Sequence, residues 1–282
     1  MSWPFDTTEP LVAPELTLAL SRKEHGLTPD NDTLPPVLVA TFQQAAYDRM
    51  LERAGATDGA AGHGGSGATG SRAVGQVAGV PVALARITVG APAAALVLEM
   101  AIARGVRTIL VAGSAGSLQP DLPLGSSVVV DGAEREDGTS HHYLPAGEVV
   151  TADPVLTDLL ETGARARGLT PIRGRSWTID APYRETVGAI RRHRNAGVAV
   201  VEMEAAAIFA LARVRGVRAG LLVAVSDELF DAWNPGFRHP SYLEALVRAA
   251  DTVMDVAATV TVNLSQKIPG LPPPDTASPP LR

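Results

Sequence analysis

Residues 198–228 read VAVVEMEAAAIFALARVRGVRAGLLVAVSDE, and this stretch carries the pattern that decides the fold. It opens with a short apolar run, Val198–Val201, and continues with an alanine-rich segment, Glu204–Arg215. A second apolar run, Arg218–Val225, closes it. Continuously apolar runs are typical of strands that are covered on both faces of a sheet. The stretch therefore predicts a strand, a helix and a second strand.

The same alternation extends along the rest of the chain. Further strands are predicted at Val37–Ala40, Val82–Ile87, Thr108–Val111 and Ser127–Val130, and further helices at Gln43–Ala54, Ala91–Arg104, Pro154–Arg167 and Ser241–Asn263. Helices placed between strands predict an α/β fold with a mostly parallel or mixed sheet. Ligands of such folds gather at the carboxyl ends of strands, so the residues that follow strands are the first candidates for a site.

Composition narrows the class of function. The chain has 282 residues, 46% of them hydrophobic, which is enough for a large core. The formal charge of −6 is spread without long runs, which disfavours nucleic acid or an anionic membrane as partner and favours a small molecule. The chain has no cysteine, which excludes disulfides, thiolate metal sites and a cysteine nucleophile. No run approaches the roughly 18 apolar residues of a membrane span, and the first residues lack the pattern of a signal peptide, so we expect a cytoplasmic protein.

Domain organisation follows from local composition. Residues 1–19 are expected to be a flexible N-terminal segment and residues 20–264 a single domain. Within that domain, residues 54–72 are rich in glycine, alanine and serine, which predicts a mobile loop. Residues 265–282 are rich in proline and poor in apolar side chains, which predicts a disordered tail.

The first candidate for a binding site is the turn VAGSAGS at residues 111–117, which follows an apolar strand. A turn of small residues exposes backbone N–H groups and lets a ligand approach the main chain, here at Gly113 and Ser114. The turn lacks the Gly-Lys-Ser/Thr of a Walker loop and the GxGxxG dinucleotide fingerprint. A tight turn without a ligand is an equally good reading of this segment alone.

The second candidate is a pair of carboxylates, Glu202 and Glu204, with Met203 between them. In extended backbone these two carboxylates point the same way. Carboxylate oxygens accept strong hydrogen bonds from vicinal sugar hydroxyls, and methionine offers an apolar surface to a sugar ring. A helix start accounts for Glu204 alone, because acidic residues suit a helix N-terminus, but it does not account for the pair.

The third candidate is Asp227, directly after the most apolar strand of the chain. Low dielectric at such a strand end disfavours a charged carboxyl, which suits the residue to hand over a proton. The common alternative is a helix N-cap formed by Ser226 or Asp227. Elsewhere, His141 and His142 have no metal-ligand spacing, so no metal site is predicted, and no Gly-x-Ser-x-Gly elbow supports a hydrolase triad.

Taken together and in this order, these segments resemble the nucleoside phosphorylase family, which includes purine nucleoside phosphorylase, uridine phosphorylase and related nucleosidases. The likeness covers about residues 20–262. Its most specific part is VEMEAA at residues 201–206 with VSD at residues 225–227; VGAP at 89–92, AGSAGSLQP at 112–120 and DGTSH at 137–141 also match. The resemblance implies a three-layer αβα sandwich around a mixed, barrel-like sheet, assembled as dimers or trimers of dimers. It also implies cleavage of the bond between base and ribose, with no cofactor but phosphate as a co-substrate.

The resemblance also implies roles for single residues. Glu204 would hold the ribose 2′- and 3′-hydroxyls, Met203 would pack on the sugar and Glu202 would support both. Asp227 sits where purine-cleaving members keep the acid that protonates the leaving base, and Ser114 where a hydroxyl bridges sugar and nucleophile. His25 would reach the ribose 5′ end of a neighbouring subunit. These roles suit the chemistry, because glycosidic cleavage builds positive charge on the sugar and negative charge on the base.

Two arginines that bind phosphate in the family are missing. The Gly-Asp-Pro-x-Arg loop after the first strand is replaced by residues 40–45, ATFQQA, and Val111 stands where the family has an arginine. We expect Arg86, which ends an apolar strand, to supply the anion contact together with Gly113 and Ser114. A surface ion pair is the alternative for Arg86.

Base identity is open at this stage. Tyr183 and Trp177 are candidates to stack on the base, and Arg184 to contact it, although aromatic residues more often pack in a core. Asp227 tilts the prediction slightly toward purine. The missing arginines leave two alternatives: a nucleosidase that uses water, and a nucleoside-binding protein without turnover. An oxidoreductase is disfavoured because its glycine fingerprint is absent.

Overall fold

The computed structural model describes residues 5–59, 70–230 and 232–266. The strands are β1 (Val37–Thr41), β2 (Gly70–Val77), β3 (Val80–Ile87), β4 (Thr108–Ser117), β5 (Ser127–Glu136), β6 (Val150–Thr151), β7 (Ile172–Ile179), β8 (Val200–Glu202), β9 (Arg218–Glu228) and β10 (Asn234–Pro235). The helices are α1 (Pro14–His25), α2 (Pro29–Asp32), α3 (Gln44–Ala54), α4 (Ala91–Ala103), α5 (Ser140–Tyr143), α6 (Pro154–Ala166), the 3₁₀ turn η1 (Pro182–Arg184), α7 (Val187–Asn195), α8 (Ala205–Arg215) and α9 (Pro240–Gln266). Every strand and helix predicted from the sequence is present, but β4 and β5 run six residues past their predicted ends. Residues 111–117, predicted as a turn after a strand, are therefore part of β4 itself.

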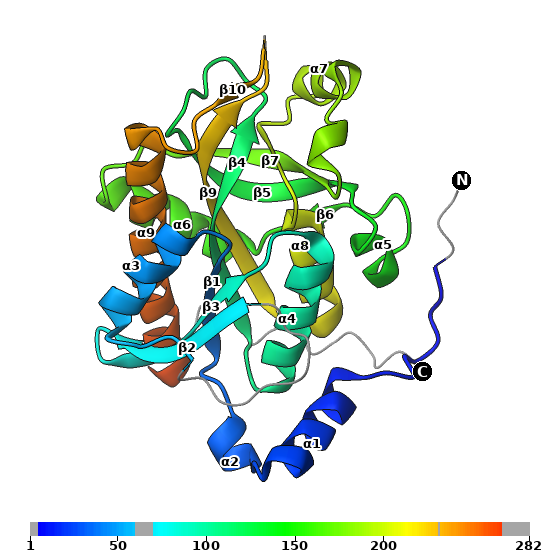
Figure 1. Cartoon of the computed structure of the whole chain (residues 1–282), viewed down its shortest axis with the longest axis vertical. Helices are drawn as coiled ribbons and strands as arrows, with labels where there is room; N and C mark the ends of the chain where they lie inside the picture. The colour runs from blue at the N-terminus through cyan, green and yellow to red at the C-terminus, as the bar shows by residue number, and fades with distance from the viewer. Residues whose placement is uncertain (1–4, 60–69, 231, 267–282) are drawn as a thin grey trace.

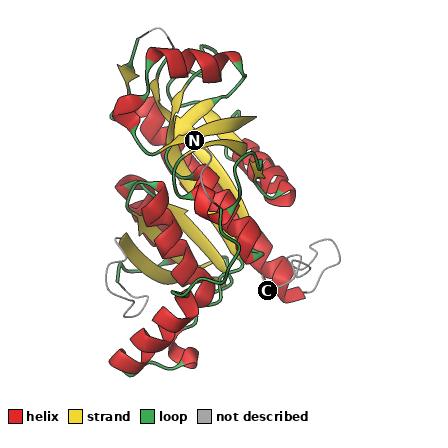
Figure 2. Ribbon diagram, turned by 90° about the vertical axis from the view of Figure 1, so that its right-hand side faces the viewer, coloured by secondary structure: helices red, strands yellow, loops and turns green. Residues whose placement is uncertain are grey.

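The strands of the described chain form one mixed sheet, part of which closes into a barrel. Its order is β10-β9-β5-β7-β8-β4-β1-β3-β2, with β6 added to β5 and a further pairing of β9 with β4. That last pairing closes a ring of β4, β9, β5, β7 and β8, in which β4 pairs with β9 in parallel and with β8 in antiparallel orientation. The strands β1, β3 and β2 extend from β4 as an open sheet. Figure 2 shows the strands curling around one another, and the prediction of a mixed, barrel-like sheet is confirmed.

Helices cover the sheet on two sides. On one side α9 contacts β1, β3, β4 and β9, with α3 and α6 beside it. On the other side α8 packs on β5, β7 and β9 and α4 packs on α8. The two groups lie left and right of the strands in Figure 1, so the predicted three-layer αβα arrangement is confirmed.

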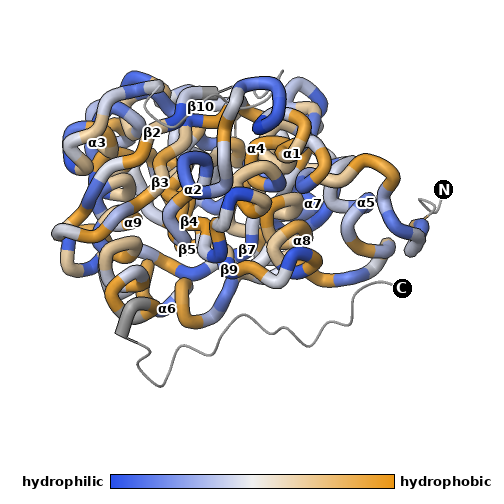
Figure 3. The backbone as a smooth tube through the Cα atoms, turned by 90° about the horizontal axis from the view of Figure 1, so that it is seen from below, coloured by the Kyte–Doolittle hydropathy of each residue, from blue (hydrophilic) through white to orange (hydrophobic). Residues whose placement is uncertain are grey.

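The central elements are buried because their residues are apolar on all sides. All residues of β1 and the first nine of β9 are buried. Residues 205–212 of α8 are buried too, and five of them are alanines, whose small side chains let the helix sit close to the sheet. In the hydropathy colouring of Figure 3, apolar stretches pass through the middle of the molecule around β3, β4 and β9.

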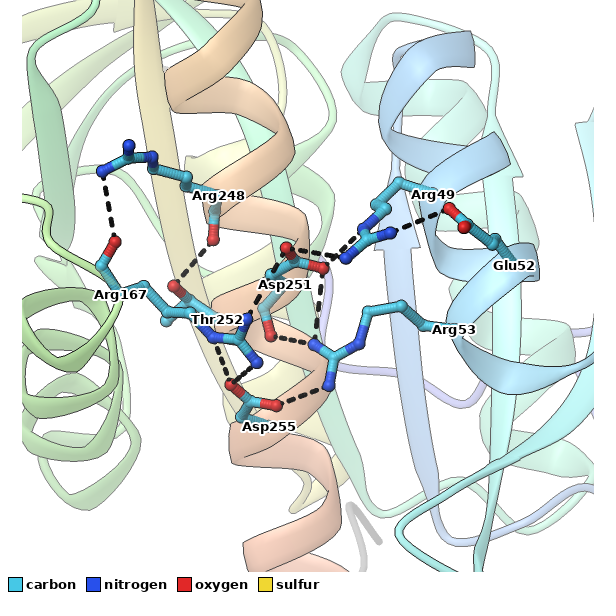
Figure 4. Close-up of polar contacts among 8 residues, drawn as sticks. All are labelled: Arg49, Glu52, Arg53, Arg167, Arg248, Asp251, Thr252 and Asp255. Carbon is cyan, nitrogen blue, oxygen red and sulfur yellow. Dashed lines mark hydrogen bonds and ion pairs between the residues drawn. The ribbon is translucent and has the colours of Figure 1, made fainter.

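A network of ion pairs joins α3, α6 and α9 on the outer face of one helix layer (Figure 4). Asp251 accepts from Arg49 at 2.8 Å, and Asp255 accepts from Arg53 at 2.7 Å. Arg167, which follows α6, reaches Asp255 at 2.6 Å. Each carboxylate of this network therefore has more than one arginine nearby, and the three helices are held to each other by charge as well as by apolar contact.

The N-terminal prediction needs a correction. Residues 14–19 of the predicted flexible segment 1–19 belong to helix α1, Pro14–His25. Leu18 of α1 is buried, and Arg22 donates to Asp32 at 3.0 Å. Asp32 also accepts from Arg104 at 3.0 Å, at the end of α4. The helix is thus tied to the domain through a buried carboxylate, a long-range contact that local composition could not reveal.

Two other predictions fall partly outside the described residues. Of the predicted mobile loop 54–72, Ala54 ends α3, residues 70–72 belong to β2, and residues 60–69 are not described. Of the predicted tail 265–282, residues 265 and 266 end α9 and residues 267–282 are not described. Within the described parts of the chain, no helix combines the length and the apolar character needed to cross a membrane.

Candidate functional site

A cavity of about 590 Å³ opens at the carboxyl ends of β4 and β9, beside the end of β8. Its walls include Ser114 from β4, Glu204 from the start of α8 and Asp227 from β9. Segments far apart in the sequence close it: the loop after β1, the turn η1 with helix α7, and the segment that follows β9. The structure thus brings to one place the three strand ends that the sequence indicated.

Glu202 is fully engaged by the protein. Its carboxylate accepts the backbone N–H groups of Glu204 and Ala205 at 2.7 and 2.6 Å, and the hydroxyl of Thr178 at 2.5 Å. The Thr178 oxygen in turn accepts the N–H of Ala206. Glu202 therefore satisfies the free N–H groups at the start of α8 and fixes the backbone of its neighbour, as an N-cap does. Burial raises the pKa of its carboxyl, against the opposing effect of these hydrogen bonds.

Glu204 is the freer of the two carboxylates. It is 6% exposed, and its Oε1 accepts one backbone N–H, from Gly90, at 2.6 Å. Burial, followed by repulsion from Glu202, raises the pKa of Glu204 to about 8. Gly90 stands at the start of α4 with a φ of 116°, a conformation that favours glycine. Glu204 lies beside Met203 in the cavity wall, where its carboxylate also accepts a hydrogen bond from the Met203 backbone N–H.

Asp227 reaches the cavity because of an irregularity in the sheet. The register between β4 and β9 shifts at Ala115 and Gly116, so that Gly116 pairs with Asp227 and Ser226 is the extra residue. Such a bulge re-aims the side chains that follow it. A Cβ at Gly116 would lie 3.3 Å from Asp227 Oδ2 and 2.3 Å from a Leu229 methyl, so a larger residue here would displace the Leu229 side chain.

The Asp227 carboxylate accepts two side-chain hydrogen bonds. The Ser226 hydroxyl donates to Oδ1 at 2.8 Å, and the indole N–H of Trp233 donates to Oδ2 at 2.9 Å. Trp233 belongs to the segment between β9 and β10 and lines the cavity itself. Asp227 is therefore not an N-cap, because it lies within β9 and not at the start of a helix.

Ser114 lies at another part of the cavity wall. Its Oγ accepts from the Gln43 side chain at 2.8 Å, and the hydroxyl of Tyr242 also hydrogen-bonds to it. Gln43 and Phe42 come from the loop after β1, the loop that departs from the family pattern. Gly113 is next to Ser114 in β4 but does not line the cavity; Phe42 and Val223 would contact a Cβ there.

The sequence did not single out Glu185, which also lines the cavity. Burial, followed by repulsion from Asp227, raises the pKa of Glu185 to about 7. No hydrogen bond or ion pair to its carboxyl is formed within the described residues. It follows the 3₁₀ turn η1, where no strand end or motif marked it, and only the burial of its carboxyl and its position in the cavity reveal it.

The other sequence candidates are distributed between the cavity and other parts of the protein. Tyr183 lines the cavity mouth with a fully exposed ring. Trp177 does not contact the cavity: it is 0% exposed, stacks on His193 with ring centroids 4.3 Å apart and donates to Glu136. The prediction that Trp177 stacks on a base is therefore corrected, because β7 turns this side chain into a separate apolar cluster. Arg184 is exposed on η1, outside the cavity wall.

His25 and Arg86 also lie outside the cavity wall. His25 ends α1, at the bottom of Figure 1, whereas α7 and β10 lie at the top. Within one chain it does not reach the site. Arg86 ends β3, paired with Thr41 of β1. Its Nη2 makes only a long contact of 3.5 Å with Ser71, and its buried Nε has no hydrogen-bond partner in the described structure.

Positive charge is scarce at the cavity. Among the described residues that line it, Arg191 of α7 is the one arginine or lysine, and it forms no ion pair there. No group of three or more His, Asp or Glu side chains in the described parts is arranged to hold a metal ion. The arrangement can thus offer acceptors to hydroxyl and N–H groups at several points around one bound molecule.

Comparisons with known proteins agree with this architecture. The family model of the phosphorylase superfamily matches residues 39–261. A guanosine phosphorylase of Halorubrum lacusprofundi is 35% identical over 153 residues, which cover 54% of this chain and 63% of that protein. A uridine phosphorylase of Haemophilus influenzae is 28% identical over 166 residues, which cover 54% of this chain and 66% of that protein. The matched part thus spans slightly less than two thirds of the length of these relatives.

A solved structure shares the fold. The crystal structure of purine nucleoside phosphorylase from Toxoplasma gondii in complex with immucillin-H superposes with a TM-score of 0.74. The superposition covers 83% of this chain and 94% of that one, at 17% sequence identity. The order of strands and helices is therefore retained although few residues are identical.

Proposed function

This chain belongs to the phosphorylase superfamily, and from that membership we propose that it cleaves the N-glycosidic bond of a nucleoside by phosphorolysis, giving a free base and ribose 1-phosphate. The observation that carries the proposal is that Glu204 and Asp227 line one cavity of about 590 Å³. A volume of this size is within the range of small-molecule sites, roughly 300–1,000 Å³, and leaves room for a nucleoside and an anion together.

The sugar is assigned to Glu204. Its carboxylate accepts hydrogen bonds from the 2′- and 3′-hydroxyls, Met203 packs against the ring, and Glu202 holds the backbone of Glu204 and Ala205 in place. As the bond to the base breaks, positive charge develops on the sugar, and a neighbouring carboxylate stabilises that charge in a site sheltered from water. Burial and repulsion from Glu202 raise the pKa of Glu204 to about 8, and hydrogen bonds donated by the two sugar hydroxyls would favour its charged form.

The base is assigned to the Asp227 side of the cavity. A phosphate oxygen attacks C1′ of the ribose, the C1′–N bond breaks, and a base nitrogen takes a proton from Asp227, which regains it from solvent. Glu185 and Tyr183 line the same region. Arg184 lies outside the cavity wall, so it would contact the base only if the η1 turn moved.

Two carboxyls at the base end, Asp227 and Glu185, suit a heterocycle with N–H donors, which supports the slight preference for purine. The guanosine phosphorylase among the relatives agrees with that preference, whereas the uridine phosphorylases leave pyrimidines as the alternative.

The phosphate is assigned to Ser114, which lines the cavity, together with Gly113 and Arg86, which lie outside the cavity wall and would reach a phosphate only from a position shifted toward it. Support comes from the unpartnered, buried Nε of Arg86, because a buried donor without an acceptor costs free energy that a ligand oxygen would recover. Arg86→Ala should raise the KM for phosphate, and Arg192→Ala, which removes an arginine paired with Glu136 outside the cavity wall, is the control. If Arg86→Ala leaves the dependence of turnover on phosphate unchanged, the assignment of Arg86 is wrong.

The proposal is tested by chromatography of the products from guanosine, inosine, adenosine and uridine, with phosphate and in phosphate-free buffer. We expect base and ribose 1-phosphate only when phosphate is present. Release of base and free ribose at the same rate without phosphate would instead identify a hydrolytic nucleosidase. Saturable binding with no release of base would identify a nucleoside-binding protein. The dimer or trimer of dimers is also part of the proposal, with His25 of one subunit at the site of another, and sedimentation of the purified chain measures it.

A further inference from the structure

Trp233 is an exposed aromatic side chain with a specific polar contact. Its side chain is 63% exposed, on the segment between β9 and β10, and its ring lies 6.3 Å from that of Phe237. Burial of apolar surface therefore does not explain its position. The contact that does is the hydrogen bond from its indole N–H to Asp227 Oδ2, at 2.9 Å.

The two donors at Asp227 come from different parts of the chain. Ser226 is the residue before Asp227 and bonds to Oδ1, whereas Trp233 comes from outside the strand and bonds to Oδ2. Rotation of a carboxylate about its last torsion is soft, so one donor alone leaves the plane of the group free to turn. Two donors, one for each oxygen, fix it.

The strength of the hydrogen bond from the indole N–H depends on the charge of Asp227. A hydrogen bond to a carboxylate is stronger than one to a neutral carboxyl, so its contribution grows as Asp227 gives up a proton. An interaction that strengthens during the reaction lowers the barrier, whereas one that is equal before and during it affects binding alone. Loss of the N–H should therefore appear in kcat more than in KM.

We propose that Trp233 is a positioning residue, whose indole N–H holds the Asp227 carboxyl toward the base and stabilises the carboxylate left after proton transfer. This inference rests on the proposed function, because it concerns the residue that protonates the leaving base. Trp233 does not itself exchange a proton with the substrate.

The test compares three variants in steady-state turnover of the nucleoside that the wild type cleaves best. Trp233→Phe keeps an aromatic ring and removes the N–H, and we expect kcat to fall about tenfold, with KM for the nucleoside within about twofold of the wild type. Asp227→Asn removes the acid. The double variant should turn over no more slowly than Asp227→Asn alone, because the N–H acts only through Asp227.

Asn234→Ala is the matched control. Asn234 is the next residue along the chain and the first of β10, and its exposed side chain donates to Glu228 at 2.8 Å without lining the cavity. We expect its kcat within about twofold of the wild type. Thermal unfolding of each variant should stay close to that of the wild type, since both side chains are exposed.

The outcomes distinguish failure of the proposed phosphorolysis from failure of the positioning role of Trp233. If the wild type releases no base from any nucleoside, the proposed function fails and the role of Trp233 fails with it. If the wild type turns over and Trp233→Phe has an unchanged kcat, or lowers kcat in the Asp227→Asn background by the same factor, the positioning role alone is wrong. If Asn234→Ala lowers kcat as much as Trp233→Phe does, the effect comes from disturbing the conformation of residues 233 and 234. That result would also overturn the positioning role of Trp233.

Discussion

Two clusters of acidic side chains in this protein differ in their partners. On the outer face of α9, Asp251 and Asp255 accept from Arg49, Arg53 and Arg167 (Figure 4). In the cavity, within the described parts of the chain, the carboxylates accept only from neutral donors and form no ion pair. The difference separates structural charges from functional ones, because burial without a cation raises the pKa of Glu202, Glu204 and Glu185 in the cavity.

The energetic consequences of the two arrangements are opposite. The α9 network stabilises the folded chain, since each arginine satisfies carboxylate oxygens on a neighbouring helix. Glu202, Glu204 and Glu185 cost free energy on folding, because burial disfavours their charged forms. Mutations in the network should therefore change stability and leave turnover intact, and mutations in the cavity should do the reverse.

The largest effect is expected for Asp227→Asn, which keeps the size of the side chain and removes the acid. Turnover should fall about 10³-fold, within the range that a positioned general acid contributes. Steady-state rates of base release measure it. Glu228→Gln is the control, because this neighbouring carboxyl accepts from Leu124 N–H and Asn234 outside the cavity wall. Equal losses in both variants would contradict the distinction between them.

Glu204→Gln should lower kcat/KM about 10²-fold, because an amide provides no negative charge to the developing positive charge of the sugar. The same variant should be at least as stable as the wild type, since it removes a carboxyl whose charged form burial disfavours. Urea unfolding and initial rates measured on one preparation give both values. A variant that is less stable and equally active would reverse the comparison between the clusters.

Asp251→Asn should cost about 2 kcal/mol of the free energy of unfolding, because it removes the charge that three arginines share. Its kcat/KM should match that of the wild type. Glu52→Gln provides a matched control: Glu52 is paired with Arg49 at 2.8 Å, but its side chain is 71% exposed, and its loss should cost less than about 0.5 kcal/mol. Urea unfolding compares the two. A larger cost for Glu52 than for Asp251 would show that the network is not the source of stability.

A further effect is expected in the pH dependence of stability. The pKa of Glu204 is 4.5 when unfolded and about 8 when folded, so the folded state binds more protons between these values. The contribution of this group to the free energy of unfolding therefore decreases as pH rises from about 5 to about 8. Glu185, with its pKa raised to about 7, acts in the same direction. Unfolding of Glu204→Gln at several pH values should show a shallower decrease than the wild type, and an identical slope would contradict the raised pKa.

Most of the fold could be predicted from the sequence because its central elements are apolar throughout. Strands such as β9 and helices such as α8 are buried on all sides, so they read as uninterrupted apolar runs. β7 was missed because its first half, IRGR, is polar and mostly exposed, and its second half alone enters the core. β2 was missed because it is glycine-containing and lies at the sheet edge, next to a segment that reads as a loop.

Site residues at the ends of strands could be predicted from the sequence, whereas site residues in irregular segments could not. Ser114 and Asp227 lie in the last residues of apolar strands and Glu204 lies just after one, and the topology of the sheet brings these strand ends together. Glu185 and Trp233 reach the same cavity from irregular segments, whose paths depend on tertiary contacts and carry no periodic signal. Trp177 was instead predicted in the site although it lies in the core, since the sequence alone cannot tell a buried aromatic side chain from one that lines a cavity.

A crystal structure of the chain with a nucleoside bound tests the central claim most directly. The account predicts ribose hydroxyl oxygens within about 2.6–3.2 Å of the Glu204 carboxylate, and a nitrogen of the same molecule within that distance of Asp227. A nucleoside bound elsewhere, or one that contacts Glu204 with its base directed away from Asp227, would contradict it.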